Sequence, residues 1–395
     1  MNIILPKLEK YQREVIDYLD GFRRRDIIAV CKAQRQMGKS TTIFCLLINE
    51  VIKSPGSTSI MMSLTYKNLR EIFRLIIKNC ERIIKNSSQS TNTIEFINGS
   101  RIIFLSANQG ENIRGFTVSG ILCIDEAAYI KDEIILNTMA FCNTFSANII
   151  LFSTPRFKSG LFYTYFTQEG VKVFDWSKYK NPFITEEKLE IIKKTMPLNL
   201  FRADYLGLWM EMNSDVFGDF SKIIKNKPYN GEKVFVGIDF GTGDGKDYTS
   251  ISVFNNNGEQ VGLRYFNDKK DLNAVEEILS FLSTFNIEKC LVEKNSIGSV
   301  FSGLLKRRAS FLIQEFNTTN DSKRKIIDGL VEKINKGEIT LLDDMEQKIQ
   351  FSSYEIQKTA TGKITYNAAN GFHDDIIMSD ALCLEIMKKG NYKYA

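Results

Sequence analysis

The first residues in this sequence with the types and spacing needed for phosphate chemistry form the run AQRQMGKS, Ala33 to Ser40. The run matches a phosphate-binding loop with alanine in place of the first glycine, and it lies between the strand-like pattern Asp26 to Cys31 and a stretch of helical periodicity. Backbone N–H groups of such a loop, here those around Gln36, Gly38 and Thr41, bind phosphate oxygens at the start of the helix. The order strand, loop, helix therefore predicts a nucleotide site.

The polar side chains at the end of this loop, and an acidic pair further along, suit ATP and magnesium. Lys39 is expected to neutralise the β- and γ-phosphates, and Ser40 to bind Mg²⁺. The apolar run Gly120 to Ile124 ends in Asp125 and Glu126. We expect Asp125 to hold Mg²⁺ through water and Glu126 to orient or deprotonate the attacking water. The competing interpretation of this acidic pair is a helix N-cap.

Two further pairs of residues agree with a nucleotide site. Tyr11 and Gln12 precede the loop, where a glutamine amide can read an adenine edge and a tyrosine can pack on the adenine ring. Ser153 and Thr154 follow the predicted strand Asn148 to Phe152, where a hydroxyl could sense the γ-phosphate and couple its loss to motion. A plain turn at the end of the strand explains Ser153 and Thr154 equally well.

Arginine side chains are the candidates for stabilising the charge that develops during phosphoryl transfer. Arg35 lies within the loop and could act on its own site, and we take it as a catalytic residue. Arg114 precedes the acid-bearing strand and could serve its own site or that of a neighbouring subunit. The sequence alone does not choose between them.

A second group of acids lies at the ends of predicted elements in the C-terminal half. Asp239 ends the apolar run that begins at Lys233, Glu293 ends another at Cys290 to Val292, and Asp374 and Asp375 open an apolar helix. Because carboxylates that share a pocket repel one another, such a pocket requires cations. Hard oxygen ligands favour Mg²⁺ or Mn²⁺.

Two such ions, with Asp239 as the bridging ligand, provide the two-metal route to cleavage of a phosphodiester. On this prediction Asp239, Glu293 and Asp374 are catalytic, and all four acids bind metal. His373 precedes Asp374 and Asp375, and ligation, protonation of the leaving group and simple capping or packing all remain open for it.

The elements around these residues predict two α/β domains. In the first half, short apolar runs alternate with helical stretches, which indicates a largely parallel sheet covered by helices. A second α/β pattern begins near Lys233 with a hairpin around the turn Asn255 to Gly258. We therefore predict an ATPase domain over residues 1–214, a linker over 215–231 and a nuclease domain over 232–395.

Composition sets weaker limits. The net charge of +5 is compatible with nucleic acid but does not require it. The basic clusters Lys306 to Arg308 and Lys323 to Lys325 could face phosphates or simply be solvated helix faces. The cysteines show no metal-ligand spacing and, as at Cys31 and Cys123, are typical of buried residues in a reducing compartment. No signal peptide or membrane span is expected.

In combination these motifs resemble the large terminase subunit of tailed bacteriophages over nearly the whole chain. The matching segments in the first half are Tyr11-Gln12, a deviant Walker A at Arg35 to Thr42, a Walker B at Ile124 to Ala128, Ser153-Thr154-Pro155 as coupling motif, and Phe201 to Gly207 as the segment that closes the ATPase domain. Those in the second half are Gly237 to Gly241, Val292 to Asn295 and Gly371 to Met378.

The resemblance implies a P-loop ATPase domain followed by an RNase H-like nuclease domain. It implies a homo-oligomeric motor that packages double-stranded DNA, with a portal protein and a small terminase subunit as partners. Such a motor works in the host cytoplasm, transiently at the portal vertex of a procapsid, and binds no membrane. The chain is short for this family, so any accessory docking segment must be small, such as the basic tail Lys388 to Lys393. The alternatives are a helicase-like DNA-dependent ATPase and a DNA-binding scaffold with degenerate sites.

Overall fold

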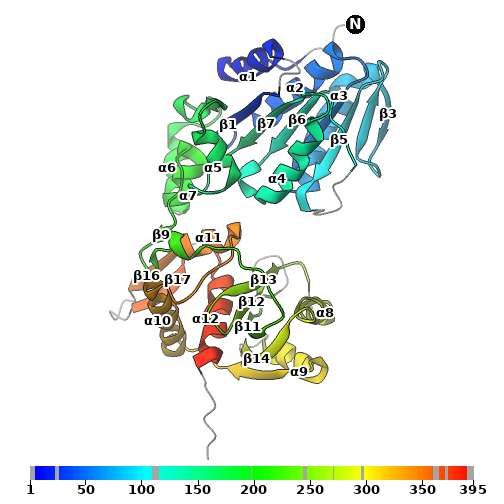
Figure 1. The fold of residues 1–395 in the computed structure, drawn as a ribbon. Coiled ribbons are helices and arrows are strands. Elements are labelled where there is room, and N and C mark those ends of the chain that lie inside the picture. Colours follow the sequence, from blue (N-terminus) through cyan, green and yellow to red (C-terminus); the bar gives the residue numbers. More distant parts are fainter. Residues whose placement is uncertain are drawn as a thin grey trace, which may run out of the picture. The chain divides into compact units, whose positions relative to one another are not determined.

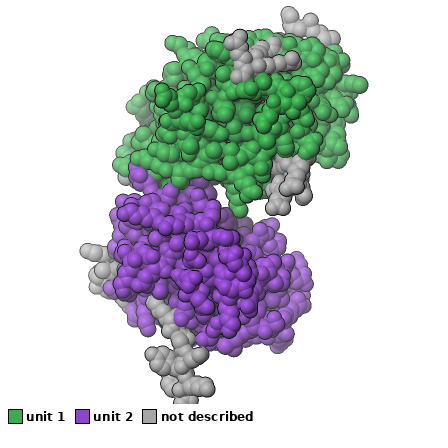
Figure 2. Space-filling view, viewed as in Figure 1, with its two compact units in different colours: residues 1–210 green, residues 211–395 purple. Residues whose placement is uncertain are grey.

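The structure is a computed structural model that describes residues 5–22, 26–108, 115–196, 198–242, 247–269, 271–294, 298–358, 364–369 and 372–388. The chain divides into two compact units, Met1–Met210 and Glu211–Ala395, which Figure 2 shows in different colours. The division falls before residue 211, whereas the sequence predicts it before residue 215. Each unit has its own sheet and its own core.

Unit 1 is built on an eight-stranded sheet with the order β3-β4-β5-β2-β6-β7-β1-β8 (Figure 1). From β5 to β8 in this order all neighbours pair in parallel, while β3 and β4 add an antiparallel edge. Every residue of β2, β6 and β7 is buried, as expected for strands covered on both faces. The predicted largely parallel sheet is confirmed. The strands are β1 Ile28–Lys32, β2 Thr58–Ser63, β3 Ile84–Ser88, β4 Thr93–Phe96, β5 Arg101–Ser106, β6 Ile121–Asp125, β7 Asn148–Ser153 and β8 Lys172–Asp175.

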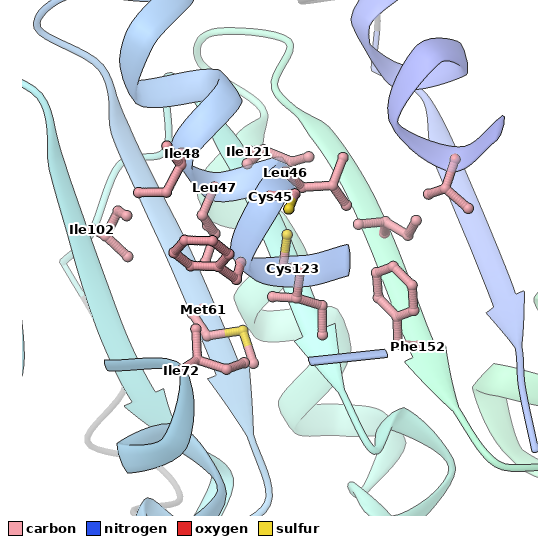
Figure 3. Close-up of a cluster of buried hydrophobic side chains, with 14 of the residues drawn as sticks. Cys45, Leu46, Leu47, Ile48, Met61, Ile72, Ile102, Ile121, Cys123 and Phe152 are labelled. Carbon is pink, nitrogen blue, oxygen red and sulfur yellow. The ribbon is translucent and has the colours of Figure 1, made fainter. Parts of the chain in front are cut away.

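Helices cover both faces of this sheet, with α1, α2 and α3 in one core and α4 and α5 in the other. In Figure 3, Cys45 and Leu47 of α2 lie among Met61, Cys123 and Phe152 from three different strands. Each such buried apolar side chain stabilises the fold by roughly 1.5–3 kcal/mol. This packing fixes α2, whose first residue is Lys39. The helices are α1 Lys10–Gly21, α2 Lys39–Lys53, α3 Tyr66–Cys80, α4 Asp132–Met139, α5 Gly160–Thr167, α6 Glu186–Thr195 and α7 Leu198–Leu206.

Unit 2 is built on a five-stranded mixed sheet with the order β13-β12-β11-β14-β15. The first three strands form an antiparallel meander, and β14 and β15 then add to β11 in parallel. This is the strand arrangement expected of an RNase H-like domain. The strands are β11 Lys233–Asp239, β12 Thr249–Asn255, β13 Gln260–Phe266, β14 Asn286–Glu293 and β15 Leu312–Phe316.

The helices of unit 2 pack on opposite faces of that sheet. Helices α10, α11 and α12 share one core with Phe235 and Leu291, while α8 and α9 share the other with Val236 and Val253. The helices are α8 Asp271–Leu282, α9 Gly298–Arg308, α10 Asn320–Lys336, α11 Met345–Ser352 and α12 Asp375–Lys388, and a hairpin of β16 Tyr354–Lys358 and β17 Ile364–Ala368 lies between α11 and α12 in the sequence. None of the helices that the structure describes is long and apolar enough to span a membrane.

Residues 215–231, expected as a linker, contribute to the core of unit 2. Phe217 is 1% exposed and Phe220 is fully buried, and both contact the ring of Phe351. The segment contains only short elements, β10 Gly218–Asp219, which pairs with β9 Asn213–Ser214 just before it, and a 3₁₀ turn Ser221–Ile223. Its glycines, single proline and polar residues are typical of a linker, but two buried aromatic side chains, which no periodic pattern marks, anchor it in a core.

Candidate nucleotide and metal sites

The phosphate loop between β1 and α2 has a left-handed backbone at two positions. Gln36 has a φ of 60°, and Gly38, the N-cap of α2, has a φ of 80°. Alternation of left- and right-handed residues turns neighbouring N–H groups toward a common side and creates an anion-binding concavity. The partial positive charge of the α2 N-terminus adds to it. A non-glycine residue such as Gln36 is strained in this conformation, and such strain is typical of ligand-binding loops.

Tyr11 and Gln12 on α1 contact the phosphate loop itself. Gln12 Nε2 donates to the Gly38 carbonyl at 3.0 Å, and the Tyr11 hydroxyl donates to the Met37 carbonyl at 3.4 Å. The Tyr11 side chain is only 4% exposed, and its ring centroid lies 4.8 Å from that of Trp176. Both residues therefore support the loop, and their part in adenine recognition stays a prediction.

The acidic pair at the end of β6 faces the lysine of the loop. Lys39 Nζ lies 3.4 Å from Glu126 Oε1. Burial raises the pKa of Asp125 to about 7, the charge of Glu126 adds to this rise, and the charge of Lys39 opposes it. Ser40 and Thr41 follow Lys39 in the first turn of α2 and are half-buried. The site thus contains a cation for phosphate beside oxygen ligands suited to Mg²⁺.

Ser153, at the end of β7, lies between the acidic pair and the phosphate-loop strand. Its hydroxyl donates to Glu126 Oε2 at 3.4 Å, and its carbonyl accepts from the Ala33 backbone at 2.9 Å. Thr154 is 2% exposed. Glu126 occupies the N-cap position of a short 3₁₀ turn, Ala127–Tyr129, but its φ of 54° is left-handed and its side chain makes no capping hydrogen bond there. The coupling role of Ser153 and Thr154 stays a prediction.

The Arg35 side chain is held by a buried carboxylate, Asp204, which the sequence motifs alone do not mark as a site residue. Its Nε lies 3.0 Å from Asp204 Oδ2 on α7, and Arg156 Nη1 lies 2.5 Å from the other oxygen of the same carboxylate. Arg156 follows Pro155 of the predicted coupling motif, and Asp204 lies in the segment taken to close the ATPase domain. In the sequence, the only signs that Arg156 and Asp204 belong to the site are that each lies in or directly after one of these motifs. Arg114 lies outside the described residues.

In unit 2, Asp239 and Glu293 end two adjacent parallel strands. The residues before them, Ile238 and Val292, are partners in the ladder, so the two carboxyl groups lie side by side. Asp239 is 6% exposed and Glu293 is 9% exposed. The pKa of Asp239 is raised well above its usual range, first by burial, then by its hydrogen bond with Glu293 and by the charges of the acids around it. The structure thus brings together two of the acids singled out in the sequence.

Asp374 and Asp375, at the start of α12, are close enough for their charges to raise the pKa of Asp239 further. Asp374 Oδ2 pairs with Lys323 Nζ at 2.7 Å, and Asp375 Oδ2 accepts from the Tyr248 backbone at 3.0 Å. Burial raises the pKa of Asp375 to about 6. Within the described ranges, no group of three or more acidic, histidine or cysteine side chains is arranged to hold a metal ion.

His373 lies beside this acidic group. Its Nδ1 is 3.7 Å from Asp375 Oδ2 and 3.9 Å from Asp247 Oδ1, and its ring meets the Tyr248 ring edge-on at 5.0 Å. These distances exceed those of a hydrogen bond, so the ligand and packing interpretations of His373 both stay predictions.

The basic clusters predicted from the sequence make ion pairs within the chain. Lys306 pairs with Glu315 at 2.6 Å, Arg308 with Glu276 at 3.6 Å and Arg324 with Asp328 at 3.6 Å. Lys323 is the member that reaches the acidic group. Its place there depends on the packing of α10 beside α12, which no local pattern indicates.

A parallel sheet with a phosphate loop and a facing acidic pair defines a P-loop ATPase domain, and an RNase H-like sheet with acids at its strand ends defines a metal-dependent nuclease domain. Residues 30–223 match the family model described as the terminase large subunit, T4-like virus type, N-terminal. The chain is 21% identical to the terminase large subunit of Thermus virus P23-45, over 91% of this chain and 85% of that protein. Together these matches identify the chain as similar, over nearly its whole length, to the large terminase subunits of phages, and they support a DNA-packaging protein that combines an ATPase with a nuclease.

Solved structures of this kind give weaker likenesses. The large terminase of a thermophilic bacteriophage in complex with ADP has a TM-score of 0.49 and 16% identity, over 97% of this chain and all of that one. The large terminase nuclease of the thermophilic phage G20c with bound cobalt has a TM-score of 0.39 and 21% identity, over 44% of this chain and 97% of that one.

Proposed function

We propose that the chain hydrolyses ATP in unit 1 to translocate double-stranded DNA into a procapsid, and cleaves concatemeric DNA in unit 2 as a two-metal endonuclease. The observation that carries this proposal is the presence of two acidic centres of different composition. Glu126 faces Lys39 beside a phosphate loop, whereas buried Asp239 and Glu293 face further acids. The first composition supports a bound phosphate anion, and the second supports bound metal cations.

In unit 1 the loop N–H groups and Lys39 would neutralise the triphosphate. Ser40 and Asp125 would hold Mg²⁺, since a hydroxyl and a buried carboxylate are hard oxygen ligands. Mg²⁺ bound there supplies positive charge to the β- and γ-phosphates. Glu126 would orient the attacking water, and Arg35 would stabilise the developing charge. Ser153, in contact with Glu126, supports a role in sensing the loss of the γ-phosphate.

In unit 2, Asp239, Glu293, Asp374 and Asp375 would hold two Mg²⁺ or Mn²⁺ ions. The donor set fits, because it consists of carboxylate oxygens that repel one another until cations are present. Ions bound there activate a water and stabilise the leaving oxygen of a phosphodiester. Asp239 is the most buried of these acids and is the proposed bridging ligand.

Similarity to this family supports a homo-oligomeric assembly. We infer that the chain acts at the portal vertex of a procapsid in the host cytoplasm, with the portal protein, a small terminase subunit and double-stranded DNA as partners.

Reciprocal substitutions test the two sites. Asp239→Ala is expected to lower cleavage of plasmid DNA in Mn²⁺ by about 100-fold or more and to leave ATP hydrolysis intact. Lys39→Ala and Glu126→Ala are expected to lose ATP hydrolysis and to keep cutting. ATP hydrolysis stimulated by DNA, with cleavage unaffected by Asp239→Ala, would instead indicate a helicase-like enzyme. DNA binding without turnover in either assay would indicate a scaffold.

A further inference from the structure

A carboxylate buried in unit 1 is shared by two arginines. Asp204 on α7 is 2% exposed, with Arg156 on one carboxylate oxygen at 2.5 Å and Arg35 on the other at 3.0 Å. Arg156 is itself only 3% exposed, and its guanidinium lies 4.6 Å from the centroid of the Tyr129 ring. Taking such groups out of water is costly, so a buried pair of this kind is weak evidence of stabilisation and is more informative about geometry.

The Arg35 end of this group belongs to the phosphate loop. The Arg35 backbone N–H donates to the Asp204 carbonyl at 2.7 Å, and Asn181 Nδ2 donates to the Arg35 carbonyl at 2.9 Å. The side chain of Arg35 is 54% exposed, in contrast to that of its partner. Because Asp204 engages Nε, the opposite edge of the planar guanidinium keeps N–H donors that suit a phosphate oxygen.

The backbone at Arg156, on the other side of Asp204, is hydrogen-bonded to the last residue of unit 1. The Arg156 carbonyl accepts from the Met210 backbone at 2.7 Å, and the Met210 carbonyl accepts from the Lys158 backbone at 3.2 Å. Met210 is the last residue of unit 1. In the other direction along the chain, Arg156 follows closely after Ser153, whose hydroxyl contacts Glu126. One carboxylate therefore links the phosphate loop, the strand end beside the acidic pair and the end of the unit.

We propose that Asp204 is a positioning residue of the ATPase, which orients Arg35 toward the γ-phosphate and ties this arginine to Arg156 and the segment 204–210. The proposal rests on the proposed ATP hydrolysis in unit 1. A γ-phosphate bound at the opposite edge of the guanidinium shares the charge of Arg35 with Asp204, so the strength with which Asp204 holds Arg35 and Arg156 depends on the nucleotide bound. The segment 204–210 then senses whether the γ-phosphate is present, by a differential interaction with the two nucleotide states.

Steady-state kinetics of the full chain test the positioning role. Asp204→Asn keeps the size of the side chain and removes its charge, while Arg35→Gln leaves the Arg156–Asp204 pair intact. Each is expected to lower kcat for ATP about tenfold or more and to change KM by less than about threefold, because the loop and Lys39 carry ground-state binding. Glu187→Gln, an exposed acid on α6, is the control and should leave both constants unchanged.

The double variant shows whether Asp204 acts through Arg35. If it does, the double variant is no slower than the slower single variant, since both changes remove the same oriented arginine. Losses in kcat that multiply would overturn the proposal. Should Asp204→Asn fail to fold, Arg35→Gln still tests the link to the segment 204–210 by hydrogen exchange.

Hydrogen exchange on the full chain is measured with ADP and with the slowly hydrolysed analogue ATPγS. In the wild type, amides of the segment 204–210 are expected to differ in exchange rate between the two nucleotides by about fivefold or more. In Arg35→Gln the difference should vanish. Equal exchange in both states of a wild type that hydrolyses ATP, or a difference that persists in Arg35→Gln, overturns the proposal alone. A wild type without ATP hydrolysis refutes the proposed function instead.

Discussion

The acidic centres of the two units differ in the charges that surround them. In unit 1, Lys39 lies 3.4 Å from Glu126, and its charge opposes the rise in the pKa of Asp125. In unit 2, the charges that act on Asp239 are those of other acids and raise its pKa, while Lys323 pairs with Asp374. The first centre has a cation in place for an anionic ligand, whereas the second has an excess of negative charge and suits a cationic one. The imbalance of charge indicates the class of ligand.

The two centres also differ in how they are assembled. The unit 1 centre consists of one contiguous strand, loop and helix with an acidic pair from a strand of the same sheet. The unit 2 centre combines Asp239, Glu293 and the start of α12, and depends on close packing of α12 on β11. The following predictions test both differences, beginning with the largest expected effect.

Gly237 tests the assembly of the unit 2 centre. A Cβ atom there would lie 2.0 Å from the Ser379 carbonyl oxygen and 2.5 Å from the Cys383 amide nitrogen, both backbone atoms of α12. We expect Gly237→Ala to lower the free energy of unfolding of unit 2 by about 3 kcal/mol and to abolish cleavage, with ATP hydrolysis retained. Calorimetry and the two assays measure this. Gly303→Ala on α9, where a Cβ meets nothing within 4 Å, is the control and should raise stability by up to about 1 kcal/mol.

Asp380 tests how unit 2 accommodates a buried acid that has no cation beside it within the described ranges, by keeping that acid protonated. It is fully buried, burial raises its pKa to about 8, and hydrogen bonds from Ser252 and Gln260 oppose this rise. The folded chain therefore keeps a proton that the unfolded chain releases above its ordinary pKa of 3.8. The associated stability is complete below about pH 4 and is lost as the pH rises through about 8.

We expect the wild type to lose about 2–3 kcal/mol of stability relative to Asp380→Asn between pH 6 and pH 8, because unfolding in this range releases a proton that the folded chain keeps. Both tryptophans of the chain, Trp176 and Trp209, lie in unit 1, so calorimetry is the suitable measurement. Parallel pH profiles of the two proteins would show that Asp380 is ionised throughout.

Amide substitutions test the sign of the charge imbalance in each centre. Asp239→Asn removes an acid whose ionised form is disfavoured by burial and by the neighbouring acids, so in the absence of metal it is expected to stabilise unit 2 by about 1–2 kcal/mol while cleavage is lost. Glu126→Gln removes the partner of Lys39 and is expected to lower the stability of unit 1 by up to about 1 kcal/mol. Melting curves with EDTA measure both. Effects of the same sign would remove the contrast between the two units.

Lys323 tests whether its ammonium group occupies the place of a metal ion beside Asp374 in the unit 2 centre. Its ammonium pairs with Asp374 at 2.7 Å, so a metal ion that uses Asp374 must displace it. Lys323→Gln is expected to raise the affinity for Mn²⁺ about three- to tenfold in calorimetric titration without DNA. Lys325→Gln, an exposed neighbour on α10, is the matched control. Unchanged affinity in Lys323→Gln would mean that Asp374 is not a metal ligand.

The sequence by itself determined the features that depend on neighbours along the chain. The strand before Ala33, the helix after Lys39, the acid-ended strand at Asp125 and the meander after Asp239 all follow from local periodicity and from residues at element ends. The two α/β folds and the family could be inferred from these patterns, because burial of a strand or helix face leaves a regular trace in the sequence. The roles assigned to individual site residues remain predictions.

Only the tertiary structure decided which residues far apart in the sequence come into contact. The sharing of Asp204 between Arg35 and Arg156, the pairing of Lys323 with Asp374 and the packing of Phe217 against Phe351 join residues far apart in the sequence. Periodicity reports which face of an element is buried, but not which element covers it. The partner of a buried charge is set by the packing of whole elements, and no local pattern of residues carries that information.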